Sequence, residues 1–124
     1  VCSSDLNAGN SLLADKSFNE LDSKAIFEAA EKGDKVALEV FELTGKWLGM
    51  GLADTVHYLS PEAIFLFGGP TAAGEYIFKP TKESMEYYLL PMYQNKVKIL
   101  PSQLKTGDAA IVGASALVYK ELEK

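Results

Sequence analysis

A short apolar run at residues 63–67 constrains the fold of this chain more than any other feature. Its sequence, AIFLF, does not alternate with polar residues, and Gly68-Gly69 follows it directly. Pro61 disfavours helix at the residue before it, so the run is separated from the preceding segment. Five apolar residues between turn signals are typical of a strand that is covered on both faces, as in parallel sheets flanked by helices. The run therefore predicts an α/β fold.

Two helices are predicted before this strand. Asp22 or Ser23 can cap a helix over residues 24–32, which Gly33 ends by accepting a left-handed backbone. Asp34 then offers a cap for a second, long helix. Apolar residues on this helix form two stripes, which predicts burial on more than one side. One stripe holds Val36, Val40, Leu43, Trp47 and Met50, and the other holds Phe41, Leu48, Leu52 and Val56.

Three glycines interrupt the long helix, at Gly45, Gly49 and Gly51. Each costs about 1 kcal/mol relative to alanine in a helix interior. We therefore expect them to allow the close approach of a neighbouring backbone.

A helix, a strand and a last helix follow the apolar run. The first helix is amphipathic and ends before Pro91, and Pro80 either opens it or kinks a helix that began near Gly74. Residues 96–100 alternate polar and apolar side chains, which predicts a strand near a sheet edge. Gly107-Asp108 is expected to cap the final helix. A strand, a helix and a strand in this order predict a right-handed crossover between parallel strands.

Two strands are too few for an independent sheet, so residues 23–124 are expected to be part of a larger domain. Residues 1–6, VCSSDL, resemble the translation of one frame of a sequencing-adapter oligonucleotide. We interpret them as non-native, with a frayed natural terminus as the alternative. Cys2 then carries no chemistry. Residues 7–22 contain no clear element.

The formal net charge of −5 argues against binding to nucleic acid or to anionic lipid. No apolar run approaches the roughly 20 residues needed to span a bilayer, and no signal peptide is recognised. We expect no nucleic acid and no membrane among the partners, and a cytoplasmic location.

Three blocks of the sequence, in this order, resemble the C-terminal lobe of sugar kinases of the ROK family, glucokinases in particular. They are residues 33–34 (GD) leading into 48–59, residues 60–69 (SPEAIFLFGG) and residues 107–114 (GDAAIVGA). The family belongs to the actin-like ATPase superfamily. The resemblance implies an incomplete ribonuclease-H-like lobe with two parallel strands flanked by helices.

The resemblance implies that Gly68, Gly69 and Pro70 are nucleotide-binding residues, placed in the adenosine motif of the family. Pro70 departs from the glycine that many members carry there, and it has no N–H to donate. The last helix is implied to pack back on the nucleotide lobe through small residues at Gly113 and Ala114. Asp108 is expected to be a helix cap before it is a ligand contact.

The implied function is a part of an ATP-dependent hexose kinase, which uses ATP and Mg²⁺ and binds a sugar. The alternative is a part of a sugar-responsive repressor of the same family. The phosphate turn Asp-x-Gly-x-Thr, the catalytic aspartate and the cysteine-rich zinc site of the family have no counterpart in this sequence. We therefore assign no catalytic or metal residue, and we expect no kinase activity from this chain alone. The complete protein is expected to be a homo-oligomer.

The remaining candidates are interpreted as structural. His57, the sole histidine, has no second ligand nearby in the sequence, so it is interpreted as a packed or partly exposed helix residue. Trp47, Tyr87 and Tyr88 are interpreted as core or interface aromatics.

Overall fold

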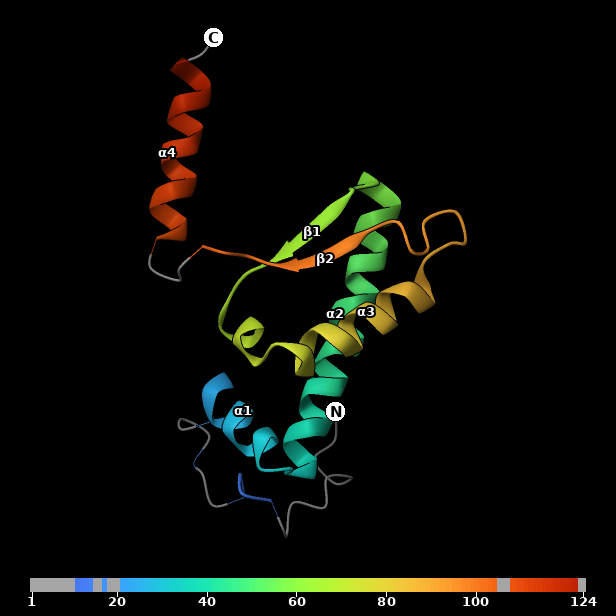
Figure 1. The fold of residues 1–124 in the computed structure, drawn as a ribbon, viewed down its shortest axis with the longest axis vertical. Coiled ribbons are helices and arrows are strands. Elements are labelled where there is room, and N and C mark those ends of the chain that lie inside the picture. The colour runs from blue at the N-terminus through green and yellow to red at the C-terminus, as the bar shows by residue number, and fades with distance from the viewer. Residues whose placement is uncertain (1–10, 15–16, 18–20, 105–107, 123–124) are drawn as a thin grey trace.

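A two-stranded sheet lies beside the helices α2 and α3 in the computed structural model of this chain (Figure 1). The described residues are 11–14, 17, 21–104 and 108–122. In chain order, the elements are α1 (Ser23–Glu31), α2 (Lys35–Leu59), β1 (Ala63–Leu66), the 3-10 helix η3 (Gly69–Ala73), α3 (Glu75–Tyr88), β2 (Lys98–Pro101) and α4 (Ala109–Leu122). The interpretation of residues 1–6 and the capping role of Gly107 lie outside the described residues.

Strands β1 and β2 are parallel, and Ala63 pairs with Lys98 while Leu66 pairs with Pro101. The ladder continues for one residue, because the Ser102 N–H donates to the Leu66 carbonyl at 2.9 Å. The crossover between the strands contains α3. This arrangement confirms the predicted α/β class and both strands, within two residues at each end.

Helices α1 and α2 are capped and separated at residues that the sequence analysis predicts. The Asp22 carboxylate accepts a hydrogen bond from the Ala25 N–H at 2.7 Å and so caps α1. Gly33 has a φ of 78°, which glycine adopts without steric cost. Asp34 caps α2.

Asp34 is only 8% exposed, and its carboxylate accepts hydrogen bonds from two directions. Within α2, the N–H groups of Val36 and Ala37 donate at 2.9 and 3.2 Å. From the segment before α1, the Ser11 hydroxyl donates at 2.9 Å and the Leu12 N–H donates as well. One carboxylate therefore caps α2 and holds residues 11–12 against it.

The pairing of α2 with α3 forms the centre of the molecule, and two of the three predicted close approaches occur there. A Cβ at Gly45 would lie 2.6 Å from Pro80 Cγ, and one at Gly49 would lie 2.7 Å from the Met85 backbone nitrogen. At Gly51 a Cβ would meet nothing within 4 Å, so that expectation is wrong. Gly51 lies on an exposed part of α2.

The predicted burial of α2 on two stripes is only partly correct. Phe41 and Val56 are buried, whereas Leu43 and Trp47 are exposed, Trp47 by 58%. The other residues of that stripe, Val36, Val40 and Met50, are half-buried, so the expectation is wrong for Leu43 and Trp47. The buried side of α2 is instead the side that carries Ala37, Gly45, Gly49 and Ala53, because small residues let α3 approach.

Pro80 lies inside α3, which begins after Gly74. The alternative in which Pro80 opens the helix is therefore excluded. Ile77, Thr81 and Met85 form the buried side of α3, and the Thr81 hydroxyl donates to the Ile77 carbonyl at 2.7 Å. Two apolar clusters result. The first includes Phe41 and Ile77, and the second includes Val56, Met85 and Val97.

The prediction that the first strand is covered on both faces is wrong for the described structure. Ile64 and Ile99 pack on the second apolar cluster, but Phe65 on the opposite face is 66% exposed, and Phe67 beyond the strand is also exposed. No described element lies over this outer face. A two-stranded sheet with helices on one side cannot cover both faces.

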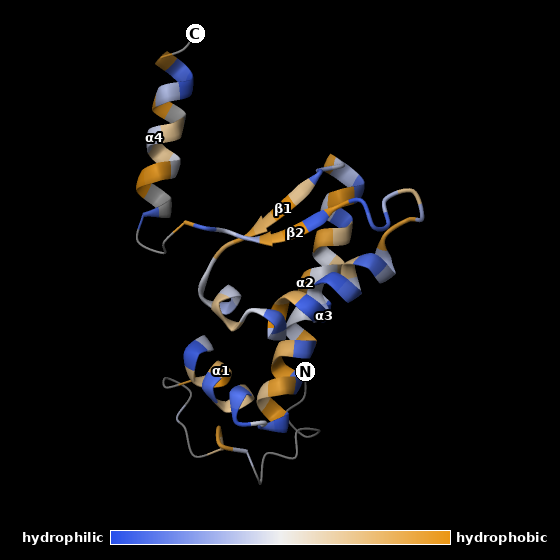
Figure 2. Ribbon diagram, in the orientation of Figure 1, coloured by the Kyte–Doolittle hydropathy of each residue, from blue (hydrophilic) through white to orange (hydrophobic). Residues whose placement is uncertain are grey.

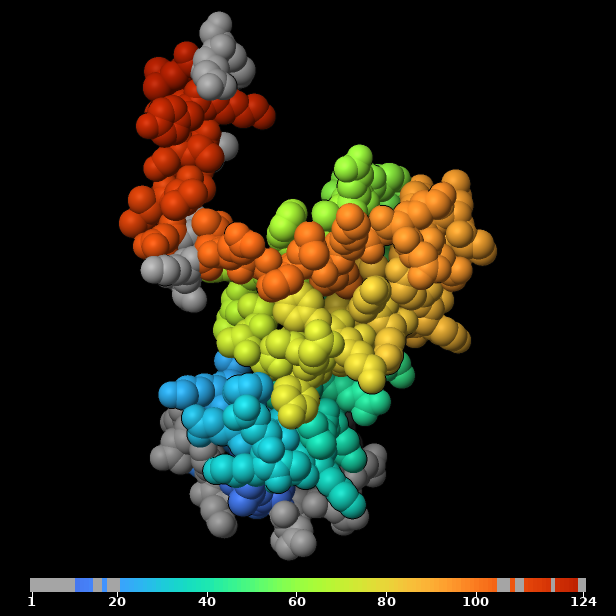
Figure 3. Space-filling view, viewed as in Figure 1, coloured from blue at the N-terminus to red at the C-terminus, as the bar shows by residue number. Residues whose placement is uncertain are grey.

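Helix α4 stands clear of the rest of the molecule (Figure 3). Its apolar residues Ile111, Val118 and Tyr119 are exposed, and apolar colour runs along this isolated helix (Figure 2). The implied packing of this helix against the nucleotide lobe is therefore absent among the described residues. Over the same residues, no helix is long and apolar enough to cross a bilayer.

Replacing Gly49 by alanine should destabilise the fold, because the new Cβ would meet backbone atoms of α3 that cannot rotate away. We expect a loss of about 1–3 kcal/mol in the free energy of unfolding, as for overpacked cores. Gly51→Ala is the matched control on the same helix, and it should stabilise by about 1 kcal/mol. Urea unfolding followed by circular dichroism measures both. If both substitutions change the free energy of unfolding equally, α3 does not approach α2 closely at Gly49.

Asp34 makes stability depend on pH. Burial raises the pKa of Asp34, but the hydrogen bonds from Leu12, Ala37, Ser11 and Val36 lower it, and the net pKa lies below its ordinary value. A carboxyl with a lowered folded pKa stabilises the fold above its unfolded pKa, and this contribution is lost as the pH falls through the folded pKa.

Asp34→Asn should therefore lower the free energy of unfolding at neutral pH, and the difference from the native chain should shrink below about pH 4, the ordinary range of aspartate. Urea unfolding over a series of pH values measures this difference. The control is Asp54→Asn, which removes a carboxylate from the exposed side of the same helix. If the free energies of unfolding of Asp34→Asn and the native chain differ by the same amount at every pH, the negative charge of Asp34 does not contribute to stability.

Candidate functional site

The predicted site lies in the turn that follows β1. Gly68 has a φ of 129° and a ψ of 174°, a backbone conformation that is essentially restricted to glycine. Its carbonyl accepts the Thr71 hydroxyl at 2.6 Å and the Thr71 N–H at 3.1 Å. The chain thereby turns from the strand directly into η3. Gly68, Gly69 and Pro70 form this turn together, as the sequence indicates.

The turn lies at the carboxyl edge of the sheet. Because β1 and β2 are parallel, their last residues, Leu66 and Pro101, are paired at the same edge. In open α/β sheets, ligands bind beyond this edge. The sheet therefore places the glycine turn where a ligand is expected.

Pro70 occupies the first turn of η3. Proline is suited to this position, because the N–H that it lacks would have no partner within the helix. The departure at Pro70 therefore does not weaken the helix, although it removes one donor from the turn. A Cβ at Gly69 would lie 3.0 Å from the Ser23 hydroxyl, so the start of α1 packs close to the turn.

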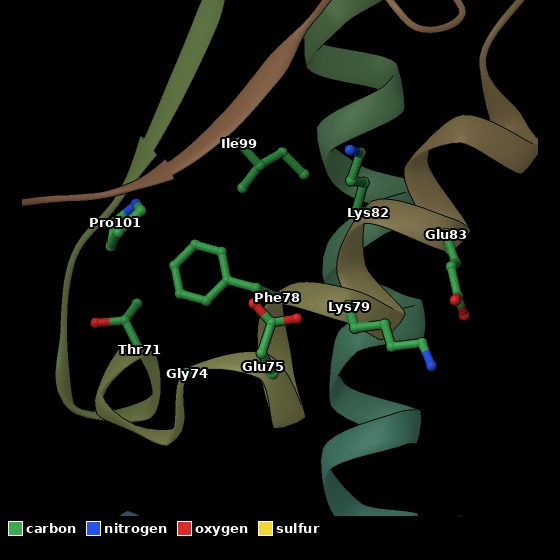
Figure 4. Close-up of a pocket in the computed structure, with 9 residues that line it drawn as sticks. All are labelled: Thr71, Gly74, Glu75, Phe78, Lys79, Lys82, Glu83, Ile99 and Pro101. Atoms are coloured by element: carbon green, nitrogen blue, oxygen red, sulfur yellow. The ribbon is translucent and has the colours of Figure 1, made fainter.

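A cavity of about 480 Å³ adjoins the turn (Figure 4). Thr71 belongs both to the turn and to the cavity wall, and Pro101 at the end of β2 forms the opposite wall. The Phe78 ring points into the space between Thr71, Ile99 and Pro101 (Figure 4). The other lining residues are Gly74, Glu75, Lys79, Lys82 and Glu83. The apolar wall suits a flat apolar part of a ligand, and the charges of Lys79 and Lys82 are balanced by those of Glu75 and Glu83.

The sequence did not reveal Phe78, Ile99 or Pro101 as site residues. The pairing of β2 with β1 brings Ile99 and Pro101 beside the glycine turn, whereas Phe78 lies on α3, which begins after that turn. Residue patterns indicate which side of a helix is apolar, but not which cavity that side lines.

The remaining sequence candidates lie elsewhere. The imidazole Nε2 of His57 accepts a hydrogen bond from the Leu90 N–H at 3.2 Å, and its ring centroid lies 5.8 Å from that of Tyr93. This agrees with the structural interpretation of His57, which is partly exposed on α2. Asp108 directly precedes α4, and its carbonyl accepts the Val112 N–H at 2.9 Å. Among the described residues, no three His, Cys, Asp or Glu side chains gather as a metal site.

The curated relatives include two kinds of protein. The chain is 31% identical over 101 residues to a glucokinase of Thermotoga maritima, covering 82% of this chain and 32% of the relative. It is also 29% identical over 99 residues to the DNA-binding transcriptional dual regulator NagC of Escherichia coli, covering 80% of this chain and 24% of the relative.

Solved structures share the fold. A candidate sugar kinase from Cytophaga hutchinsonii matches with a TM-score of 0.80 and 30% identity, over 91% of this chain and 36% of that chain. A ROK family glucokinase from Streptomyces griseus, in complex with glucose and AMPPNP, matches with a TM-score of 0.73 and 34% identity, over 89% of this chain and 36% of that chain.

The parallel strands, the crossover helix and the turn at the carboxyl edge therefore belong to the actin-like ATPase fold. The sequence profile described as the ROK family matches residues 2–121, nearly the whole chain. The chain belongs to the ROK family. It spans about a third of the length of the glucokinases that it matches.

Gly68→Ala should destabilise the chain, because alanine is strained at the φ of Gly68. We expect a loss of about 1–3 kcal/mol in the free energy of unfolding. The control is Gly69→Ala, where φ is not positive and the only close atom is the Ser23 hydroxyl, which can rotate. Gly69→Ala should therefore lower the free energy of unfolding by less than Gly68→Ala does. Urea unfolding compares the two, and a Gly68→Ala chain as stable as the native one would contradict the assigned geometry.

Proposed function

We propose that this chain is part of an ATP-dependent hexose kinase and that it binds the adenosine side of ATP. The observation that carries the proposal is the turn of Gly68, Gly69 and Pro70, which lies at the carboxyl edge of the sheet and beside the cavity at Phe78. The glucokinases among the relatives support the assignment to phosphoryl transfer.

The residues at the turn fit a nucleotide by their chemistry. Gly68 and Gly69 have no side chain, so their backbone can approach a ribose or a phosphate closely. In the proposed arrangement the nucleobase lies against the apolar wall of Phe78 and Ile99. Lys82, on the same cavity wall, supplies positive charge toward the phosphates.

We assign this chain a role in binding and none in bond making. Phosphoryl transfer requires a carboxylate to accept the hydroxyl proton of the sugar and acidic groups around Mg²⁺. The described residues contain no cluster of three such side chains, so we derive no step through the metal. We also propose that residues 23–124 are one part of a C-terminal lobe, and that the complete protein supplies the other groups.

A second candidate function is a sugar-responsive transcriptional regulator, because NagC is among the relatives. The kinase remains our proposal, because the run Phe67-Gly68-Gly69 is intact. A regulator that does not use ATP has no need to keep a nucleotide turn.

The test uses the complete protein, expressed with the coding sequence upstream of residue 7. ADP formation with Mg-ATP and a series of hexoses should show turnover, and Gly68→Ala should raise KM for ATP severalfold while KM for the hexose changes little. The chain of 124 residues alone should show no turnover.

Two results would contradict this proposal. Turnover by the 124-residue chain would show that the catalytic groups lie within it. A complete protein that binds DNA through a helix-turn-helix and forms no ADP with any hexose would favour the regulator.

A further inference from the structure

Another cavity lies beside β2, which pairs only with β1 among the described residues. It has a volume of about 260 Å³. Consecutive residues of β2 line it, although neighbouring side chains of a strand point to opposite faces of a sheet. The cavity therefore lies beside the backbone of β2, on the edge that β1 leaves free. We call it the β2-edge cavity, and its lining includes Lys82, Glu86, Asn95, Lys98, Ile99 and Leu100.

The backbone of β2 offers hydrogen-bonding groups to this cavity. The Lys98 N–H donates to the Glu62 carbonyl at 3.2 Å. Four residues later, the Ser102 N–H donates to the Leu66 carbonyl at 2.9 Å. In a parallel ladder alternate residues of a strand face the same neighbour, so the N–H and C=O groups of Ile99 face the opposite side. No described strand pairs with β2 there, which leaves the Ile99 backbone open to a ligand in the β2-edge cavity.

The charged side chains of the β2-edge cavity are two lysines, Lys82 and Lys98, and one glutamate, Glu86. The Phe78 cavity instead has as many glutamates as lysines, and two hollows between α2 and α3 have more glutamates than lysines. The whole chain carries a formal net charge of −5. A cavity with a surplus of lysines in an acidic chain is suited to an anion.

The Glu86 carboxylate holds the loop before β2. Its Oε2 accepts the Asn95 N–H at 2.9 Å, and its Oε1 is buried. Asn95 has a φ of 60°, in the left-handed region that asparagine accepts more readily than most residues. The Gln94 amide donates to the carbonyls of Glu86 and Leu89 at 3.3 and 3.2 Å. Hydrogen bonds therefore fix the loop wall of the cavity, and they leave the two lysines as the charged groups that can approach a ligand.

We propose that the β2-edge cavity binds a phosphate group, either free or as the ester of a small polar molecule. Lysine amines bind phosphate through their charge, and backbone N–H groups donate to its oxygens. Because one water molecule takes about 30 Å³ of liquid volume, a cavity of about 260 Å³ has room for a short polar chain attached to the phosphate. The Asn95 side chain and the Ile99 carbonyl are placed to bind hydroxyl groups of that chain.

Lys82 connects this cavity with the Phe78 cavity, because Lys82 and Ile99 line both. Its amine lies on the side of Ile99 away from Thr71 and points in the direction opposite to the Lys79 amine (Figure 4). One amine cannot bind phosphates in both cavities at once. A phosphate in the β2-edge cavity should therefore oppose the binding of ATP. This coupling rests on the proposed function, whereas the phosphate site itself does not.

The site is tested by calorimetric titration of the complete protein, expressed with the coding sequence upstream of residue 7, in the absence of nucleotide and hexose. The probes are glycerol phosphate and inorganic phosphate. Lys98 lines the β2-edge cavity and not the Phe78 cavity, so Lys98→Ala should weaken binding roughly tenfold or more through the loss of a charged contact. Lys79→Ala is the matched control, because Lys79 lines the Phe78 cavity only, and it should bind the probes as the native protein does.

The two probes identify the source of the phosphate. Tighter binding of glycerol phosphate than of inorganic phosphate assigns the site to an ester, and equal or weaker binding assigns it to free phosphate. The proposal is overturned if neither probe binds, or if Lys79→Ala weakens binding and Lys98→Ala does not. Circular dichroism shows whether each variant is folded.

The coupling is measured by ADP formation with the complete protein. The probe that binds should raise KM for ATP severalfold without changing kcat, and Lys98→Ala should remove this inhibition while its KM for ATP without the probe stays native. Binding that leaves KM for ATP unchanged, or inhibition that persists in Lys98→Ala, would refute the coupling through Lys82. If the complete protein forms no ADP with any hexose, the proposed function fails, and the calorimetric test of the phosphate site is unaffected.

A measurement on the native protein keeps the test decisive if Lys98→Ala does not fold. Acetic anhydride acylates exposed amines, and mass spectrometry gives the rate at each lysine. The probe should slow acylation of Lys82 and Lys98 severalfold and leave the rates at Lys46 and Lys79 unchanged, and all four residues are exposed in the structure. Rates at Lys82 and Lys98 that are the same with and without either probe would show that no phosphate occupies the cavity.

Discussion

The rest of this structure depends on the contact between the backbones of α2 and α3 at Gly45 and Gly49. Without side chains at these positions, the two helices approach so closely that a single added Cβ would collide with Pro80 or Thr81. The crossover helix α3 links β1 to β2, so its position against α2 also sets the position of the strands. The glycine turn and the cavity both follow from this contact.

Helix α3 packs against α2 with one buried side, and its two flanks face different surroundings. Ile77 and Met85 are buried, and Phe78 on one flank lines the cavity beside the glycine turn. On the other flank, Tyr87 and Pro80 line a groove between α2 and α3. A proline is acceptable inside this helix, because its ring fills the space that Gly45 leaves open.

Several apolar surfaces stay uncovered for one physical reason. Two strands and the helices on one side of them cannot enclose the outer face at Phe65, and α4 has no described neighbour for residues such as Ile111. The segment that matches the glucokinases is about a third of their length. The sequence predicts that β1 is buried on both faces and implies that the last helix is packed. Neither is found among the described residues.

The sequence by itself indicated the α-helices and strands, a cap at Asp22 or Ser23 and another at Asp34, the α/β class and the glycine turn at Gly68, but not η3. These features depend on contacts between residues that are near in the chain, so local patterns reveal them. Only the tertiary structure decided that Gly49 is crowded whereas Gly51 is free, that Leu43 and Trp47 face solvent, and that Phe78 and Ile99 line one cavity. These facts depend on which helix lies against which, and neither spacing nor hydrophobicity along the chain specifies that partner.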